Sequence, residues 1–159
     1  MRLLVISVGK VREKYLNAWI KDFLTRLRPY VGVEYVEGLE QRIQPRPSPA
    51  EIASVLEKEG QRILSYIKEG DYVVALDSRG ESMTSEELAQ NIESLMNRGT
   101  SRVVFIVGGS HGLASDILKR AHAILSFSAL TFPHQLAVLM LLEQVYRSFK
   151  IIRGEPYHK

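Results

Sequence analysis

The chain contains the stretch Val103-Val104-Phe105-Ile106-Val107-Gly108-Gly109-Ser110-His111-Gly112, in which five apolar residues run directly into a glycine-rich turn. A second apolar run, Ala123-Ile124-Leu125, leads into Ser126-Phe127-Ser128-Ala129-Leu130-Thr131-Phe132-Pro133-His134. Continuous apolar runs are typical of strands buried in a parallel sheet. Turns that follow parallel strands lie at the carboxyl edge of the sheet, where open α/β folds bind ligands. The two turns therefore predict one shared ligand pocket.

Strand and helix patterns alternate along the rest of the chain. Apolar runs predict strands at residues 2–8, 33–36, 72–76, 103–107 and 122–125. Helical spacing of apolar residues predicts helices at residues 14–28, 48–68, 84–97, 116–120 and 133–152. Between them we expect loops, including residues 77–80. The alternation predicts an α/β fold, with a mainly parallel sheet and helices on both faces, in a single domain of residues 1–159.

The start of the second predicted helix has a clear signal. Ser48 is a good N-cap, Pro49 suits the first helical position, and Glu51 completes a capping box. We expect this helix to run to about Lys68, because Gly70 then stops it.

Composition excludes several classes of protein. Hydrophobic residues make up 45% of the 159 residues and charged residues 25%, as in ordinary globular proteins. No cysteine is present, which rules out disulfides and thiolate metal sites. The four histidines are not closely paired, so we expect no metal. No apolar stretch is long enough to span a bilayer and no signal peptide is recognisable, so we expect a cytoplasmic protein without a membrane partner.

Charge is unevenly distributed along the chain. The net charge is +5 over residues 1–28, −5 over residues 29–143 and +3 over residues 144–159. Two basic ends are typical of a protein with a polyanionic partner such as nucleic acid. The alternative is a solvated basic helix and a frayed tail.

The last predicted helix is apolar on every side along residues 136–142. A helix that packs on one sheet face needs only an apolar stripe, so something else must cover the remainder. We expect a homodimer formed through this C-terminal helix. The alternative is a helix that passes through the core of a monomer.

The turn at 108–112 has two chemical interpretations. It matches Gly-x-Ser-x-Gly, the nucleophile elbow of α/β hydrolases, with Ser110 as the nucleophile. Few acidic residues and histidines follow it, and the chain is short for a hydrolase. In the other interpretation, glycines without Cβ let backbone amides approach a ligand closely.

The segment 126–134 mixes hydroxyl and apolar side chains. Such a mixture suits a ligand with a flat apolar part and several polar edges, such as an adenosine. His134, near the start of the last helix, is a candidate general base, although histidine at this place is more often structural.

Several motifs in order identify a family resemblance. They lie at residues 8–10 (Val-Gly-Lys), 58–64, 74–77, 106–112, 125–135, 143–147 (Glu-Gln-Val-Tyr-Arg) and 153–159. With these motifs, the chain resembles from end to end the RlmH family of bacterial ribosomal RNA methyltransferases, which belong to the SPOUT class. The resemblance implies a C-terminal trefoil knot, with the knot and the cofactor site in about residues 72–159. Sequence pattern alone would not have predicted a knot.

The resemblance also implies a cofactor, S-adenosyl-L-methionine, and the residues that contact it. These are Leu76, Gly108, Phe127, Ser128, Ala129, Leu130, Thr131 and Phe132. The family is homodimeric, which agrees with the expectation from the last helix.

The implied reaction is methylation of N3 of a pseudouridine in the 23S rRNA of the assembled ribosome. We expect Tyr157 and His158 to orient the base or accept its proton, and Arg147 and Arg153 to bind phosphate or neutralise developing charge. His134 remains a rival base. A small hydrolase and a non-catalytic ribosome-binding protein are the alternative functions.

Overall fold

A computed structural model describes residues 1–159 and contains a single five-stranded sheet. The strands are β1 (Arg2–Ser7), β2 (Gly32–Glu37), β3 (Tyr72–Ser82), β4 (Arg102–Val107) and β5 (Ala123–Ser126). The helices are α1 (Lys14–Leu27), α2 (Pro49–Leu64), α3 (Ser85–Asn97), α4 (Ser115–Arg120) and α5 (His134–Ile152). The strand order is β2-β1-β4-β3-β5, and every pairing is parallel. The predicted α/β fold is confirmed.

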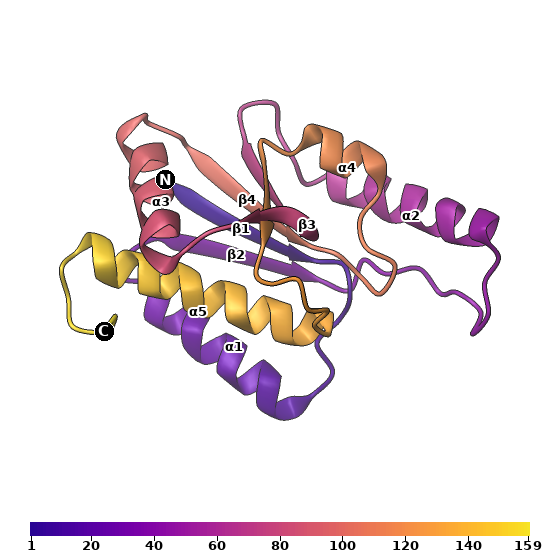
Figure 1. The fold of residues 1–159 in the computed structure, drawn as a ribbon, viewed down its shortest axis with the longest axis horizontal. Helices are drawn as coiled ribbons and strands as arrows, with labels where there is room; N and C mark the ends of the chain where they lie inside the picture. The colour runs from indigo at the N-terminus through magenta and orange to yellow at the C-terminus, as the bar shows by residue number, and fades with distance from the viewer.

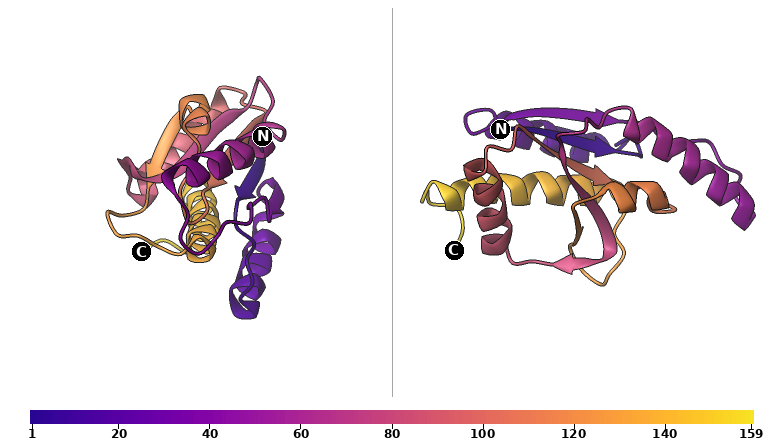
Figure 2. Two further views of the ribbon diagram at one scale, coloured as in Figure 1. Left: turned by 90° about the vertical axis from the view of Figure 1, so that its right-hand side faces the viewer. Right: turned by 90° about the horizontal axis from the view of Figure 1, so that it is seen from above.

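The sheet is covered on both faces, as predicted (Figure 1). Because side chains alternate along a strand, Leu3 and Val5 of β1 point to one face and Leu4 and Ile6 to the other. The first face forms the larger core, under α1, α3 and α5, and the second forms a smaller core under α2 and α4. Helices α1 and α5 lie side by side on the first face (Figure 2).

Two element boundaries were predicted wrongly. Helix α2 ends at Leu64 rather than near Lys68, because the next residues form a turn in which the Lys68 N–H donates to Asp71 Oδ2 at 2.6 Å. Residues 77–80, predicted as a loop, belong to β3. This strand continues to Ser82 and pairs with β5 a second time, after an irregularity that follows Leu76.

The capping prediction for α2 is confirmed. The Ser48 side chain accepts from the Glu51 N–H, and the Glu51 carboxylate accepts from the Ser48 N–H at 2.7 Å. These two bonds satisfy backbone donors that a helix start leaves free. Helix α2 therefore begins where its sequence predicts.

One side of α5 is buried in the larger core, through residues that include Val138, Leu142 and Phe149. Leu136 and Met140, one helical turn apart, are only half-buried and belong to neither core. The helix thus leaves part of its apolar surface uncovered by its own chain. The homodimer stays a prediction.

No helix is both long and apolar enough to cross a membrane. No group of three or more histidine, aspartate or glutamate side chains is arranged to hold a metal ion.

Candidate active site

A pocket of about 620 Å³ lies at the carboxyl ends of β4 and β5, beside the middle of β3. Its lining includes seven of the eight residues expected to contact a cofactor: Leu76, Gly108, Phe127, Ser128, Leu130, Thr131 and Phe132. Ala129 is not part of the lining. The two turns that follow β4 and β5 therefore form one pocket, as their sequences predict.

The glycine turn after β4 folds back on itself. Gly112 has a positive φ of 85°, and its N–H donates to the Gly109 carbonyl at 3.1 Å. A Cβ at Gly108 would lie 2.8 Å from the carbonyl oxygen of Gly112. Glycine at 108 is thus required by the closure of the turn itself, before any ligand approaches.

The loop after β5 is held in shape by two serine hydroxyls. Ser126 is buried, and its Oγ lies 3.2 Å from the Ser78 carbonyl oxygen and 3.1 Å from that of Ser128. The Ser128 hydroxyl in turn accepts from the Leu130 N–H at 3.1 Å. These bonds fix the loop against the second half of β3. The pocket is lined by residues of both segments.

Asp77 provides the only carboxylate of the pocket lining. Its two oxygens accept from Arg79 Nε and Nη2, each at 2.9 Å. These hydrogen bonds hold the pKa of Asp77 below its ordinary value, so the group is ionised at neutral pH. Asp77 was not predicted as a site residue. Its position directly after the apolar run 72–76 is the signal that could have revealed it.

His134 also lines the pocket, at the first position of α5. Its Nε2 lies 3.3 Å from the Lys10 carbonyl oxygen, and its ring packs against Gly9. The neighbouring Gln135 Oε1 accepts from the Arg12 and Glu13 N–H groups, at 2.8 and 3.2 Å. These contacts tie the start of α5 to the segment after β1, which gives His134 a structural role.

The structure does not support the hydrolase interpretation. Ser110 is exposed, and its hydroxyl makes no hydrogen bond to a histidine or a carboxylate. No residue other than glycine has a positive φ, so the strained serine backbone of a nucleophile elbow is absent.

The C-terminal tail brings together three of the four residues expected to act on the substrate. Arg147 Nη2 donates to Glu143 Oε1 at 2.6 Å, and the Tyr157 hydroxyl donates to the same oxygen at 3.0 Å. His158 Nδ1 lies 3.4 Å from Arg147 Nη1. Arg153 is separate: it is exposed, and its guanidinium lies over the Tyr30 ring.

The turns that line the pocket lie at the start of α5, and the tail follows its other end (Figure 1). The tail then folds back, so that the Tyr157 hydroxyl lies at Glu143 and the His158 ring lies at Arg147. Neither Tyr157 nor His158 lines the pocket of its own chain.

Two effects raise the pKa of the Tyr157 phenol above its ordinary value: burial and the hydrogen bond to Glu143. At neutral pH this phenol keeps its proton. Tyr157 is thus a hydrogen-bond donor. Of the two roles expected for it, this favours orientation of the base over acceptance of its proton.

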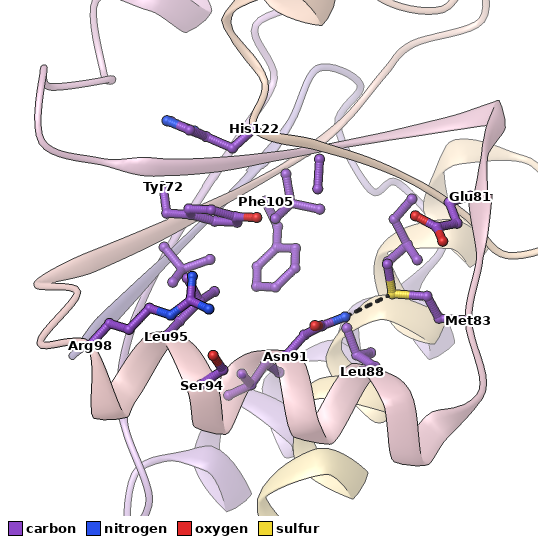
Figure 3. A pocket seen from close by; sticks show the side chains of 15 residues that line it. Tyr72, Glu81, Met83, Leu88, Asn91, Ser94, Leu95, Arg98, Phe105 and His122 are labelled. Atoms are coloured by element: carbon purple, nitrogen blue, oxygen red, sulfur yellow. Dashed lines mark hydrogen bonds between the residues drawn. The ribbon is translucent and has the colours of Figure 1, made fainter.

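A second pocket, of about 400 Å³, lies between α3 and the sheet (Figure 3). Phe105 lines its centre, Tyr72 and His122 lie at one end, and Glu81 and Met83 lie at the other. Tyr72 begins β3, so the pocket extends beside the amino halves of the strands. It does not include the two turns that predicted a ligand site.

Fold and pocket together define an open α/β protein with a ligand site at the carboxyl edge of its sheet. Two solved structures share this fold. A probable methylase family protein from Haemophilus influenzae matches 99% of this chain and 70% of its own, at a TM-score of 0.55 and 11% identity. A probable methyltransferase from Bordetella pertussis matches 93% of this chain and 96% of its own, at a TM-score of 0.55 and 14% identity.

Sequence comparison is more specific. A family model described as Predicted SPOUT methyltransferase matches residues 1–158. Relatives named Ribosomal RNA large subunit methyltransferase H are 50% identical in Halothermothrix orenii, 49% in Alkaliphilus oremlandii and 44% in Syntrophomonas wolfei, each over the full length of both chains. The chain belongs to the SPOUT methyltransferase family, and the resemblance seen in its sequence is confirmed. It is a methyltransferase.

Proposed function

We propose that this enzyme transfers a methyl group from S-adenosyl-L-methionine to N3 of a pseudouridine in the 23S rRNA of the assembled ribosome. The observation that supports this most directly is the pocket at the carboxyl edge, in a chain that matches the family model over 158 residues. Relatives named as ribosomal RNA large subunit methyltransferases support the substrate class.

The pocket fits S-adenosyl-L-methionine in size and in chemistry. A volume of about 620 Å³ is within the range of small-molecule sites. Phe127 and Phe132 provide apolar walls for an adenine, and the Asp77 carboxylate can accept from ribose hydroxyls or face a cationic sulfonium. When bound, the cofactor supplies an activated methyl group, so the protein has chiefly to align the reactants.

The tail acts, in this proposal, on the pocket of a second copy. Neither Tyr157 nor His158 lines the pocket of its own chain, so a second chain is needed to complete the site. An antiparallel arrangement of two α5 helices brings the tail of one copy to the pocket of the other.

Exposed apolar residues support a dimer through the same face. Tyr15 and Trp19 of α1, four residues apart, are 64% and 54% exposed. Their helix packs against α5, where Leu136 and Met140 are only half-buried and belong to neither core. Burying large side chains of this kind contributes about 1.5–3 kcal/mol each, which suffices for a stable dimer.

The tail side chains have distinct roles in the proposed reaction. N3–H of a pseudouridine is a weak acid and must lose its proton during attack. Tyr157, whose hydroxyl hydrogen is donated to Glu143, orients the base by accepting a hydrogen bond from it, and His158 accepts the proton. Arg147 and Arg153 bind phosphate or neutralise developing negative charge. The basic ends of the chain suit an rRNA partner in the cytoplasm.

Calorimetry and a methylation assay test this proposal together. We expect S-adenosyl-L-methionine to bind the unaltered protein and not Gly108→Arg, whose side chain fills the pocket. Deletion of residues 156–159 should abolish methylation of ribosomes and leave cofactor binding nearly intact. A deleted enzyme that still methylates ribosomes contradicts the role of the tail.

A further inference from the structure

The His158 imidazole lies between two charged groups of opposite sign. Its Nε2 is 2.8 Å from Glu86 Oε1, and its Nδ1 is 3.4 Å from Arg147 Nη1. A carboxylate only accepts hydrogen bonds, and a guanidinium only donates them. Of the two tautomers of a neutral ring, these contacts therefore select the one whose hydrogen is on Nε2, which leaves the lone pair on Nδ1.

Glu86 is held in place by the first turn of α3. The turn starts with a capping box between Thr84 and Glu87, and the Ser85 hydroxyl donates to Gln144 Oε1 of α5 at 2.7 Å. Hydrogen bonds from its own backbone N–H and from His158 hold the pKa of Glu86 below its ordinary value, so it is a carboxylate at neutral pH.

On the other side of the His158 ring, Arg147 is also held in place by neighbouring side chains. It pairs with Glu143 and lies over the Tyr157 ring, 4.8 Å from the centroid. Its contact with His158 Nδ1 is long, however, and a substrate N–H can replace it there. The His158 ring thus has one close partner, Glu86, and one more distant partner, Arg147, which a substrate group can displace.

We infer that Glu86 is a positioning residue for the proposed reaction: it fixes His158 as the Nε2–H tautomer, with Nδ1 as the proton acceptor. This rests on the proposed role of the tail. The N3–H bond of the base breaks and its proton moves to Nδ1. The electron pair left on N3 forms the bond to the methyl group, and the pair of the broken sulfur–methyl bond stays on sulfur. Glu86 then stabilises the imidazolium that has formed.

The contribution of Glu86 is orientation rather than stability of the fold. Its side chain is 53% exposed, and exposed ion pairs stabilise a fold only weakly. We therefore expect Glu86→Ala to unfold at nearly the temperature of the unaltered protein and still to lose activity.

Nuclear magnetic resonance of protein with labelled histidine tests the tautomer directly. Ring nitrogen and carbon shifts should report one Nε2–H form of His158 in the unaltered full-length protein and a mixture in Glu86→Ala. On ribosomes, kcat of Glu86→Ala should fall at least about 10-fold, while KM and cofactor affinity stay unchanged. Glu86→Gln, which keeps an acceptor oxygen but no charge, should restore the tautomer and only part of the rate, because it does not stabilise the imidazolium.

Glu93→Ala is the matched control, because Glu93 is exposed on the same helix and its side chain forms no hydrogen bond or ion pair. An unchanged tautomer and unchanged kcat in Glu86→Ala overturn the inference. If the unaltered protein fails to methylate ribosomes, the proposed function is wrong. In that case the histidine spectra alone decide whether Glu86 sets the tautomer.

Discussion

Gly9 lies so close to His134 that a Cβ at position 9 would come within 2.4 Å of the imidazole Nε2. The two residues are 125 positions apart and belong to different motifs of the family resemblance. Their contact, together with the bond between His134 and the Lys10 carbonyl, fixes the start of α5 against the end of β1. This junction forms one side of the candidate cofactor pocket, to which His134 contributes.

Replacing Gly9 by alanine should disturb this junction. The added methyl group must displace the His134 ring, and overpacking of this kind costs about 1–3 kcal/mol of unfolding free energy. We expect Gly9→Ala to lower both the free energy of unfolding, measured in urea, and the affinity for S-adenosyl-L-methionine. His134→Ala removes the obstacle, so Gly9→Ala combined with His134→Ala should be more stable than the sum of the single effects. Strict additivity would contradict the contact.

The glycine turn offers a matched pair of substitutions. At Gly108 a Cβ would meet the backbone of Gly112 at 2.8 Å, whereas at Gly109 it would meet only the Val8 side chain, at 3.4 Å. Gly108→Ala should therefore weaken binding of S-adenosyl-L-methionine at least 10-fold, about 1.4 kcal/mol, and Gly109→Ala should weaken it much less. Calorimetry on both variants measures the difference. Equal affinities would show that closure of the turn does not shape the site.

A nearly buried ion pair should make the fold sensitive to acid. Asp71, 4% exposed, pairs with Arg102 at 2.5 Å. Burial acts to raise the pKa of Asp71, but the hydrogen bonds from Arg102 and the Lys68 N–H outweigh it and keep the pKa below its ordinary value. The stabilisation is thus present above the ordinary carboxyl pKa and is lost as pH falls through the lowered one.

Asp71→Ala tests this pair. It should cost about 3 kcal/mol near pH 7, because Arg102 is left without its partner. The difference from the unaltered protein should shrink below about pH 4, as Asp71 becomes protonated in both states. Urea unfolding at several pH values measures it. A difference that stays constant with pH would contradict the ionised pair.

The exposed aromatic residues of α1 test the dimer. Trp19→Glu places a charge on the proposed interface and should give a monomer in sedimentation experiments. The monomer should still bind S-adenosyl-L-methionine, whose pocket is formed by one chain, and should not methylate ribosomes. A dimeric Trp19→Glu protein would show that the interface lies elsewhere.

The sequence predicts the sheet well because its strands are short apolar runs bounded by turn residues. It misses the second half of β3, since Asp77, Ser78 and Arg79 are polar, and β5, with which Glu81 and Ser82 pair, lies more than 40 residues further along. Local pattern gives no information on such a contact. The end of α2 was predicted wrongly for a different, local reason: a turn in which the Lys68 N–H donates to Asp71 replaces its last residues.

The sequence predicts only part of the candidate site. The two turns reveal the pocket because parallel strands end at one edge of a sheet. The roles within it depend on three-dimensional contacts: the packing of His134 on Gly9 gives it a structural role that the sequence does not show. The sequence also does not show that the tail folds back onto α5 and lies outside the pocket lining of its own chain.

Mixing two inactive proteins tests whether the site is shared between copies. One carries Gly108→Arg and the other lacks residues 156–159. In a mixed dimer, one intact pocket faces one intact tail, so up to about a quarter of the sites should regain activity after subunit exchange. Each protein alone should stay inactive. A mixture without activity, although exchange occurs, would contradict action of the tail on the partner's pocket.

Mass mapping of 23S rRNA shows whether the protein methylates one pseudouridine. Ribosomes that lack the modification are incubated with the protein and with S-adenosyl-L-methionine labelled in its methyl group, and the rRNA is then cut into fragments. We expect one labelled methyl group, at N3 of a single pseudouridine, and none with Gly108→Arg. Absence of label from the large-subunit rRNA, or label at another kind of nucleotide, would contradict the proposed function.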